Sequence, residues 1–129
     1  MKLTLIDPPR EFAVGKAEIV TLRDCAHIQL EPDELVTFVT ESGAEYDVGR
    51  KSWGFYATPS LNSRLTQFGW RALLVKSPGG RFYIFLVESG KEAELERYMK
   101  MEEHTVVCWL DSDQALETVE RKLRVSDEG

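Results

Sequence analysis

The stretch RFYIFLVESGKEAELERYMKMEEHTVVCWL, residues Arg81–Leu110, decides the fold of this chain. It begins with the apolar run Phe82–Val87, which has the composition of a strand. An amphipathic segment follows, in which Ser89 and Glu92 have the spacing of a helix capping box. The β-branched run Thr105–Leu110 completes the unit. The order strand, helix, strand predicts one β-α-β crossover.

The run Phe82–Val87 has no polar alternation, which is typical of a strand with both faces covered. On the edge of a sheet, such a run would invite aggregation. We therefore expect it at the centre of its sheet. Arg71–Lys76 precedes it as a hairpin partner, and Ser77–Gly80 forms the turn between them.

The N-terminal half is predicted to be rich in short strands. Four runs have suitable composition and are bounded by turn residues, namely Glu18–Arg23, His27–Leu30, Leu35–Thr40 and Ala44–Val48. The turn residues Glu41–Gly43 are predicted to join the last two runs. In the last run, apolar residues alternate with Glu45 and Asp47, as in a strand with one wet face. At the other end, Asp113–Arg124 is predicted to be a helix whose start Asp111 or Ser112 can cap.

A short middle helix is predicted over Pro59–Phe68. Thr58 is a favoured N-cap residue, and proline is well suited to the first helical position. Leu61, Leu65 and Phe68 repeat along one helix face, and Gly69 follows as a C-terminal glycine. A second interpretation is that these apolar residues belong to the core and that Thr58 only starts a helix.

Together these elements predict an α+β fold. We expect a single domain over residues 1–129, with a mixed, mostly antiparallel sheet, a β-rich N-terminal half, a short middle helix, one β-α-β crossover and a C-terminal helix. The length suits one domain, and residues 126–129 are expected to be frayed. No segment approaches a membrane span, and Cys25 and Cys108 are expected to be reduced, so the sequence favours a cytoplasmic protein.

Charge is unevenly distributed along the chain. The net charge is −6, yet the forty residues Val48–Val87 contain six basic and no acidic side chains. They also contain eight of the thirteen aromatic residues. Cationic and aromatic groups together suit an anionic ligand with a flat or apolar part. The alternative is that the basic middle only pairs with the acidic flanks within the fold.

The predicted site is the start of the middle helix, where unpaired backbone N–H groups and the helix dipole attract anions. Its candidate ligand-binding residues are Arg50, Lys51, Trp53, Tyr56, Thr58, Ser60, Asn62 and Arg64. Ser60 and Arg64 would contact the anion, and the aromatic rings would stack on an apolar part. The leading hypothesis is therefore a small, soluble, non-enzymatic module for an anionic small molecule, such as a nucleotide or phosphosugar.

The alternative hypothesis is a protein-interaction or homo-oligomerisation module that uses the aromatic segment Trp53–Phe68, because Trp, Tyr and Arg are enriched in interfaces. An enzyme that uses His27 or His104 has no supporting residue spacing, and we predict no catalytic residue, metal or cofactor. The net acidity argues against a nucleic-acid partner.

Overall fold

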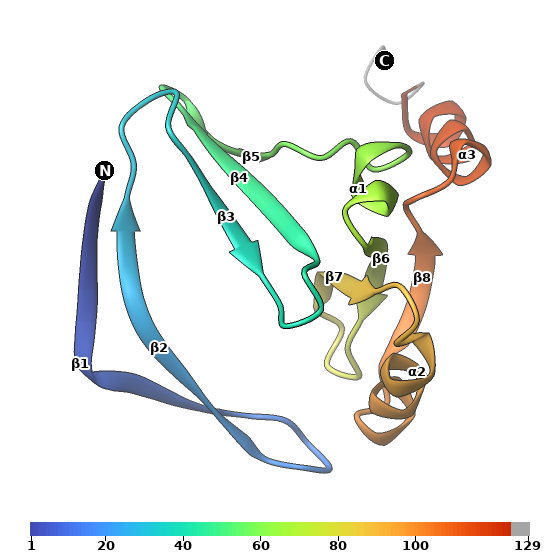
Figure 1. Cartoon of the computed structure of the whole chain (residues 1–129). Helices are drawn as coiled ribbons and strands as arrows, with labels where there is room; N and C mark the ends of the chain where they lie inside the picture. The colour runs from blue at the N-terminus through green and yellow to red at the C-terminus, as the bar shows by residue number, and fades with distance from the viewer. Residues whose placement is uncertain (125–129) are drawn as a thin grey trace.

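The crossover predicted from Arg81–Leu110 is present in the computed structural model, which describes residues 1–124 (Figure 1). Strand β7 (Phe82–Glu88) leads through helix α2 (Glu92–Met101) to strand β8 (Thr105–Trp109). Both strands pair antiparallel with β6 (Trp70–Lys76), which lies between them. They are therefore parallel to each other, as a crossover requires.

The predicted central position of the run Phe82–Val87 is wrong. The strand order is β7-β6-β8, so β7 is an edge strand and β6 is central. Ile84 is 59% exposed, and Phe82 and Tyr83 are exposed as well. The hairpin partner β6 became central because the crossover places β8 on its other side. A continuous apolar run therefore indicated a strand here, but it did not indicate the order of the strands.

The core lies on both faces of β6. Trp70 and Ala72 point to one face and pack with Ala44 and Leu65. Leu73 and Val75 point to the opposite face, where they pack with Val87 of β7 and Met99 of α2. Alternate residues of β6 thus belong to two apolar clusters on opposite faces. This explains why β6 is the most buried strand.

A second sheet has the order β3-β4-β5, and its strands are Leu35–Val39, Glu45–Lys51 and Gly54–Ala57. The hairpin predicted around Glu41–Gly43 is confirmed. The start of β4 is joined to the first sheet, since the indole N–H of Trp70 donates to the carbonyl oxygen of Glu45 at 2.7 Å. Every strand pairing in residues 1–124 is antiparallel, and the expected single mixed sheet is replaced by three sheets.

The third sheet is a long hairpin, which we call the ribbon, formed by β1 (Lys2–Val14) and β2 (Val20–Gln29). Figure 1 shows it on one side of the molecule, bent so that the turn between β1 and β2 lies toward α2. The sequence predicted two short strands in the region of β2 and none at β1. The ladder shifts register between Leu5 and Arg10, where Pro8 and Pro9 cannot donate backbone hydrogen bonds.

The middle helix is much shorter than predicted. Helix α1 spans Arg64–Gln67, and Ser63 is its N-cap residue. Thr58 does not cap it, because the helix begins well after this residue; the Thr58 N–H donates to the carbonyl oxygen of Asp47 and ties this segment to β4. The backbone turns at Ser60, whose carbonyl oxygen accepts the N–H of Leu65.

The C-terminal helix is confirmed with the predicted bounds. Helix α3 spans Asp113–Arg124, and the Ser112 hydroxyl accepts the N–H of Ala115 at 3.1 Å. The capping box predicted for α2 does not form, because Lys91 is the N-cap residue and the Glu92 carboxylate accepts the N–H of Gly90. The expected fraying of residues 126–129 lies outside the described part of the chain. No helix in residues 1–124 is long and apolar enough to cross a membrane.

Candidate functional site

The ribbon has one mainly apolar face. Residues directly opposite each other in an antiparallel pair lie on the same face. Four such pairs are apolar, namely Leu3–Ile28, Leu5–Ala26, Phe12–Leu22 and Val14–Val20. Their four β2 members are separated by even numbers of residues within one continuous strand, so all four pairs share one face. We call this surface the ribbon face.

The ribbon face is largely uncovered in the described chain. None of its eight residues is buried, and Leu5 is 73% exposed. The opposite face carries mainly polar side chains, among them Lys2, Thr4, Thr21 and Arg23. A two-stranded hairpin is marginally stable alone in water and normally gains stability from a layer packed on its apolar face. Within residues 1–124, most of the ribbon is therefore a sheet without a second layer.

A buried carboxylate anchors the tip of the ribbon to the rest of the protein. The tip is the turn of residues 15–19 between β1 and β2. Glu102, at the C-terminal end of α2, is only 3% exposed. Its carboxylate accepts the backbone N–H groups of Lys16, Ala17 and Glu18 at 2.5, 3.2 and 3.1 Å. The neighbouring Glu103 forms an ion pair with the Lys16 ammonium. This geometry sets the position of the tip relative to α2.

The hydrogen bonds of the tip also favour the ionised form of the anchor. The Lys16 N–H, followed by that of Glu18, lowers the pKa of Glu102 below its ordinary value of 4.5, although burial acts in the opposite direction. At the other end of the ribbon, the Met1 ammonium pairs with Glu34 at 3.0 Å. The backbone N–H of Glu31 is the main cause of the lowered pKa of Glu34.

A polar cluster interrupts the ribbon face near the register shift. Asp24 is opposite Arg10 in the ladder, and its carboxylate accepts hydrogen bonds from the Arg10 guanidinium. His27 Nε2 lies 3.0 Å from the same carboxylate oxygen. The Arg10 hydrogen bond, followed by that of His27, lowers the pKa of Asp24. The charges of this cluster are thus paired within the ribbon.

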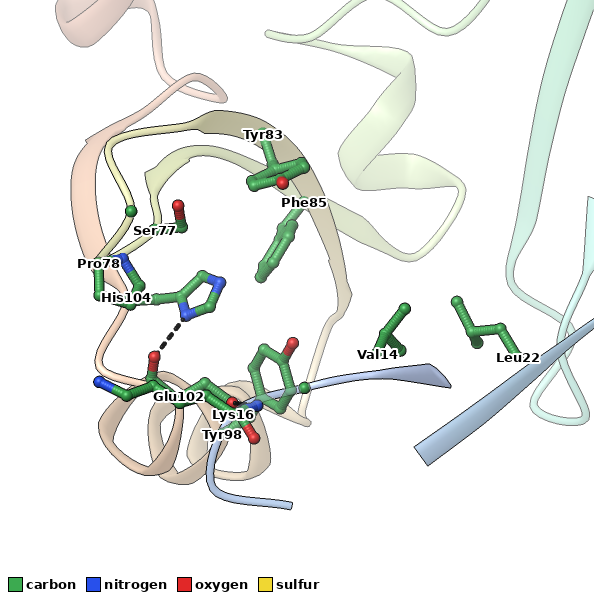
Figure 2. Close-up of a pocket in the computed structure, with 12 residues that line it drawn as sticks. Val14, Lys16, Leu22, Ser77, Pro78, Tyr83, Phe85, Tyr98, Glu102 and His104 are labelled. Carbon is green, nitrogen blue, oxygen red and sulfur yellow. Dashed lines mark hydrogen bonds between the residues drawn. The ribbon is translucent and has the colours of Figure 1, made fainter. Parts of the chain in front are cut away.

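A pocket lies between the tip of the ribbon and the sheet of β6 and β7 (Figure 2). Its volume is about 410 Å³. One side carries the rings of Tyr83, Phe85, Tyr98 and His104, and the ribbon contributes Val14 and Leu22 opposite them. Phe85, Tyr98 and His104 form a mutual ring cluster with centroids 5.7–6.1 Å apart.

The structure separates the predicted ligand-binding residues into two groups. The first lies at the β4–β5 turn, where Trp53 is 72% exposed and its ring centroid is 6.3 Å from that of Tyr56. Lys51 is paired with Asp33 at 2.8 Å. Arg50 lies over the Phe55 ring, and its Nη1 atom is buried without a hydrogen-bond partner. Figure 1 shows this turn at the end of the sheet remote from α1.

The second group surrounds α1. The Ser60 hydroxyl accepts the N–H of Arg64, and the Arg64 guanidinium lies over the Phe68 ring at 5.0 Å. The Asn62 amide donates to Asp113 at 2.7 Å. Thr58 is held to β4. The anion site itself stays a prediction, but the helix start that was expected to provide it is absent at Pro59.

The basic middle is satisfied mainly within the chain. In residues 1–124, Lys51 pairs with Asp33 and Arg71 pairs with Asp111, as the alternative of acidic flanks predicted. Other cations of this segment lie over aromatic rings, including Lys76 over Phe82. These intramolecular contacts involve basic and aromatic side chains, which are the two residue types from which the anion site was predicted.

Sequence reasoning missed the ribbon face and its anchor. The ribbon face had a detectable signal, because Leu3 and Leu5 alternate with polar residues in the unassigned N-terminal segment. Glu102 had a weaker signal: a carboxylate at a helix C-terminus opposes the helix dipole, so it needs another source of stabilisation. The tip N–H groups that provide this stabilisation are more than eighty residues away in sequence.

No group of three or more His, Cys, Asp and Glu side chains in residues 1–124 is arranged to hold a metal ion. No protein-family model matches the chain, and neither a curated protein nor a solved structure shows significant similarity to it.

Proposed function

We propose that this chain is a self-association module in which two copies pack their ribbon faces together. The observation that carries the proposal is the exposed apolar ribbon face. An exposed apolar strip on a hairpin without a second layer is a typical protein-interaction surface. Two such ribbons stacked face to face would form a small β-sandwich and bury both strips.

A second copy is the partner that this surface fits best. A two-fold axis brings the same surface of both subunits together, so that apolar side chains meet apolar side chains. Charge does not oppose this arrangement within the ribbon. Residues 2–29 carry four basic and four acidic side chains, so the ribbon is formally neutral while the whole chain carries −6. The acidic excess thus lies outside the proposed contact.

The aromatic turn between β4 and β5 would form a secondary part of this interface. Trp53, Phe55 and Tyr56 are exposed, which agrees with the original interaction hypothesis for this segment. Leu65 and Phe68 belong to the core cluster and do not provide interaction surface. The proposal therefore keeps the interaction function and places its main surface on the ribbon.

Sedimentation velocity over a range of protein concentrations tests this function. We expect a monomer–dimer equilibrium in the micromolar range. Leu5→Asp places a charge within the proposed contact, so dimer affinity should fall by more than about tenfold. Thr4→Asp is the matched control, because it adds the same charge on the opposite, polar face of β1.

Both substituted positions are exposed, so neither variant should alter folding of the monomer. Circular dichroism and thermal unfolding verify this point. A wild-type protein that is monomeric at every concentration would refute self-association. Equal weakening by Leu5→Asp and Thr4→Asp would show that the apolar face is not the contact.

A further inference from the structure

We infer that the pocket at the tip of the ribbon is a binding site for a planar aromatic small molecule that carries a hydrogen-bond donor. The pocket shares Val14 and Leu22 with the tip end of the ribbon face, but Leu3 and Leu5 do not line it. Its volume of about 410 Å³ lies within the range of small-molecule sites. The chemistry of its walls and of one histidine nitrogen defines the class of ligand.

The walls favour a flat ring. On one side, Phe85, Tyr98 and His104 present their rings at tilted angles of 32–53° to one another. On the other side, the ribbon presents the aliphatic side chains of Val14 and Leu22 (Figure 2). A ring placed between these walls would contact aromatic edges and faces on one side and methyl groups on the other.

His104 provides the polar group that selects a donor. Its Nδ1 atom lies 3.0 Å from the carbonyl oxygen of Glu102, and a carbonyl oxygen can only accept a hydrogen bond. The proton of the neutral imidazole therefore lies on Nδ1, and Nε2 carries a lone pair. Figure 2 shows Nε2 on the side of the ring that faces Phe85, inside the pocket.

The same backbone contact makes this acceptor rigid. His104 directly follows the Glu102–Glu103 pair that holds the ribbon tip, and the N–H of His104 donates to the carbonyl oxygen of Met99 at 2.8 Å. The imidazole is thus oriented by α2 on one side and by the ring cluster on the other. A preorganised acceptor between apolar walls discriminates strongly between ligands with and without a donor.

Indole and N-methylindole are suitable probes, because they share a ring system and only indole carries an N–H donor. Titrations followed by amide NMR at about pH 8, where an ordinary imidazole is neutral, measure both affinities. We expect saturable shifts with indole at Ser77, Gly79, Phe85 and His104. N-methylindole should bind roughly three- to tenfold more weakly, which is the effect of one lost hydrogen bond.

His104→Phe keeps an aromatic ring in the wall and removes the acceptor. In this variant, indole should lose its advantage over N-methylindole. His27→Phe is the matched control, since it removes the exposed histidine of the ribbon and should leave the difference intact. If His104→Phe fails to fold, the comparison of the two probes in the wild-type protein still decides the question.

Three outcomes would overturn the inference. The first is the absence of saturable shifts with both probes up to their solubility limits. The second is equal affinity for both probes, which would exclude selection by His104 Nε2. The third is a set of shifts confined to the base of the ribbon, around Leu3 and Ile28. Such shifts would indicate general adsorption to an apolar surface.

Discussion

Glu102 is the residue on which the position of the ribbon depends. Its carboxylate accepts hydrogen bonds from three backbone N–H groups of the tip, which would otherwise need water as their acceptor. Gly15 allows the backbone to make this turn, because it has a φ of 111° and an added Cβ would meet the Glu18 carbonyl oxygen at 2.1 Å. One side chain of α2 thus orders a turn that has no regular structure of its own.

Glu102→Gln should release the tip from α2. The substitution keeps the size of the side chain but replaces one acceptor oxygen with an NH₂ donor that would face backbone N–H groups. We expect faster amide hydrogen exchange at Lys16, Ala17 and Glu18, and little change in the strands β6 and β7. Unchanged protection at these three amides would contradict the role of the anchor.

The anchor should also fail in acid. The folded-state pKa of Glu102 is lowered, so its stabilisation is fully present above the ordinary value of 4.5 and is lost as the pH falls through the folded-state pKa. Lys16, Glu103 and His104 are the other ionisable groups close to this carboxylate. Chemical shifts of the three tip amides, recorded between about pH 6 and 2, should report this transition.

The Gln variant is the control for the acid transition, because it cannot titrate at this position. Global acid unfolding is not a suitable measure. Asp24, Glu34 and Glu88 also have lowered pKa values, owing chiefly to Arg10, the backbone of Glu31 and the Thr40 hydroxyl respectively. An acid transition of the tip amides that persists in the Gln variant would assign it to another group.

Strand β6 is the element that holds the fold together. It carries residues of both core clusters and pairs with strands on both sides. The run that appeared most suited to the centre, β7, instead exposes half of its length at an edge. Burial along these two strands therefore gives a direct test of the strand order.

Leu73→Ala should be much more costly than Ile84→Ala. Leu73 is fully buried, and its truncation should lower the free energy of unfolding by about 2–5 kcal/mol. Ile84 is 59% exposed, so its truncation should cost less than about 1 kcal/mol. Urea denaturation measures both. A large loss with Ile84→Ala would place β7 in the centre, as the sequence first suggested.

Helix α1 offers a second test at the level of elements. Because the Ser60 hydroxyl accepts the Arg64 N–H, Ser60→Ala should cost about 1 kcal/mol of unfolding free energy. Thr58→Ala should cost less, because the structure assigns no hydrogen bond to its hydroxyl and only its backbone holds it to β4. The reverse order would support a helix that begins at Pro59.

At the scale of the whole molecule, charge and apolar surface are separated. The ribbon is formally neutral, and the remaining chain carries the net charge of −6. The ribbon lies on one side of the molecule (Figure 1) and is held at its tip by Glu102 and at its base by Glu34. Two copies could therefore join through their ribbons while their acidic portions remain apart.

This separation predicts the salt dependence of dimerisation. Added salt should strengthen the dimer modestly, because the Debye length falls from about 30 Å at 0.01 M to about 10 Å at 0.1 M and screens the repulsion between the acidic portions. Apolar contacts between the ribbon faces are not weakened by this screening. Sedimentation at low and high ionic strength measures the effect. A dimer that salt dissociates would be held by ion pairs instead.

The sequence by itself determined the elements that depend on neighbouring residues. The helix Asp113–Arg124, its Ser112 cap, the hairpin at Glu41–Gly43 and the hairpin at Ser77–Gly80 all follow from local periodicity and turn chemistry. These signals are local because each hydrogen bond joins residues that are close in the chain or paired across a short turn. The α+β class follows from their order.

Only the tertiary structure decided what covers each element. The apolar run of β7 became an edge because β8 returns to the far side of β6. The predicted helix at Pro59 was shortened because the Thr58 backbone is bonded to Asp47. The predicted site was divided because Asn62 is bonded to Asp113 and the β4–β5 turn lies far from α1.

The ribbon shows most clearly why these outcomes could not be read locally. Leu5 is paired with Ala26 across the ladder, and the Lys16 N–H is paired with Glu102 more than eighty residues away. Such contacts bring together segments that no local pattern connects, and their free energy depends on the packing of the whole chain. The sequence thus specified an amphipathic strand, and the three-dimensional structure left its apolar face exposed.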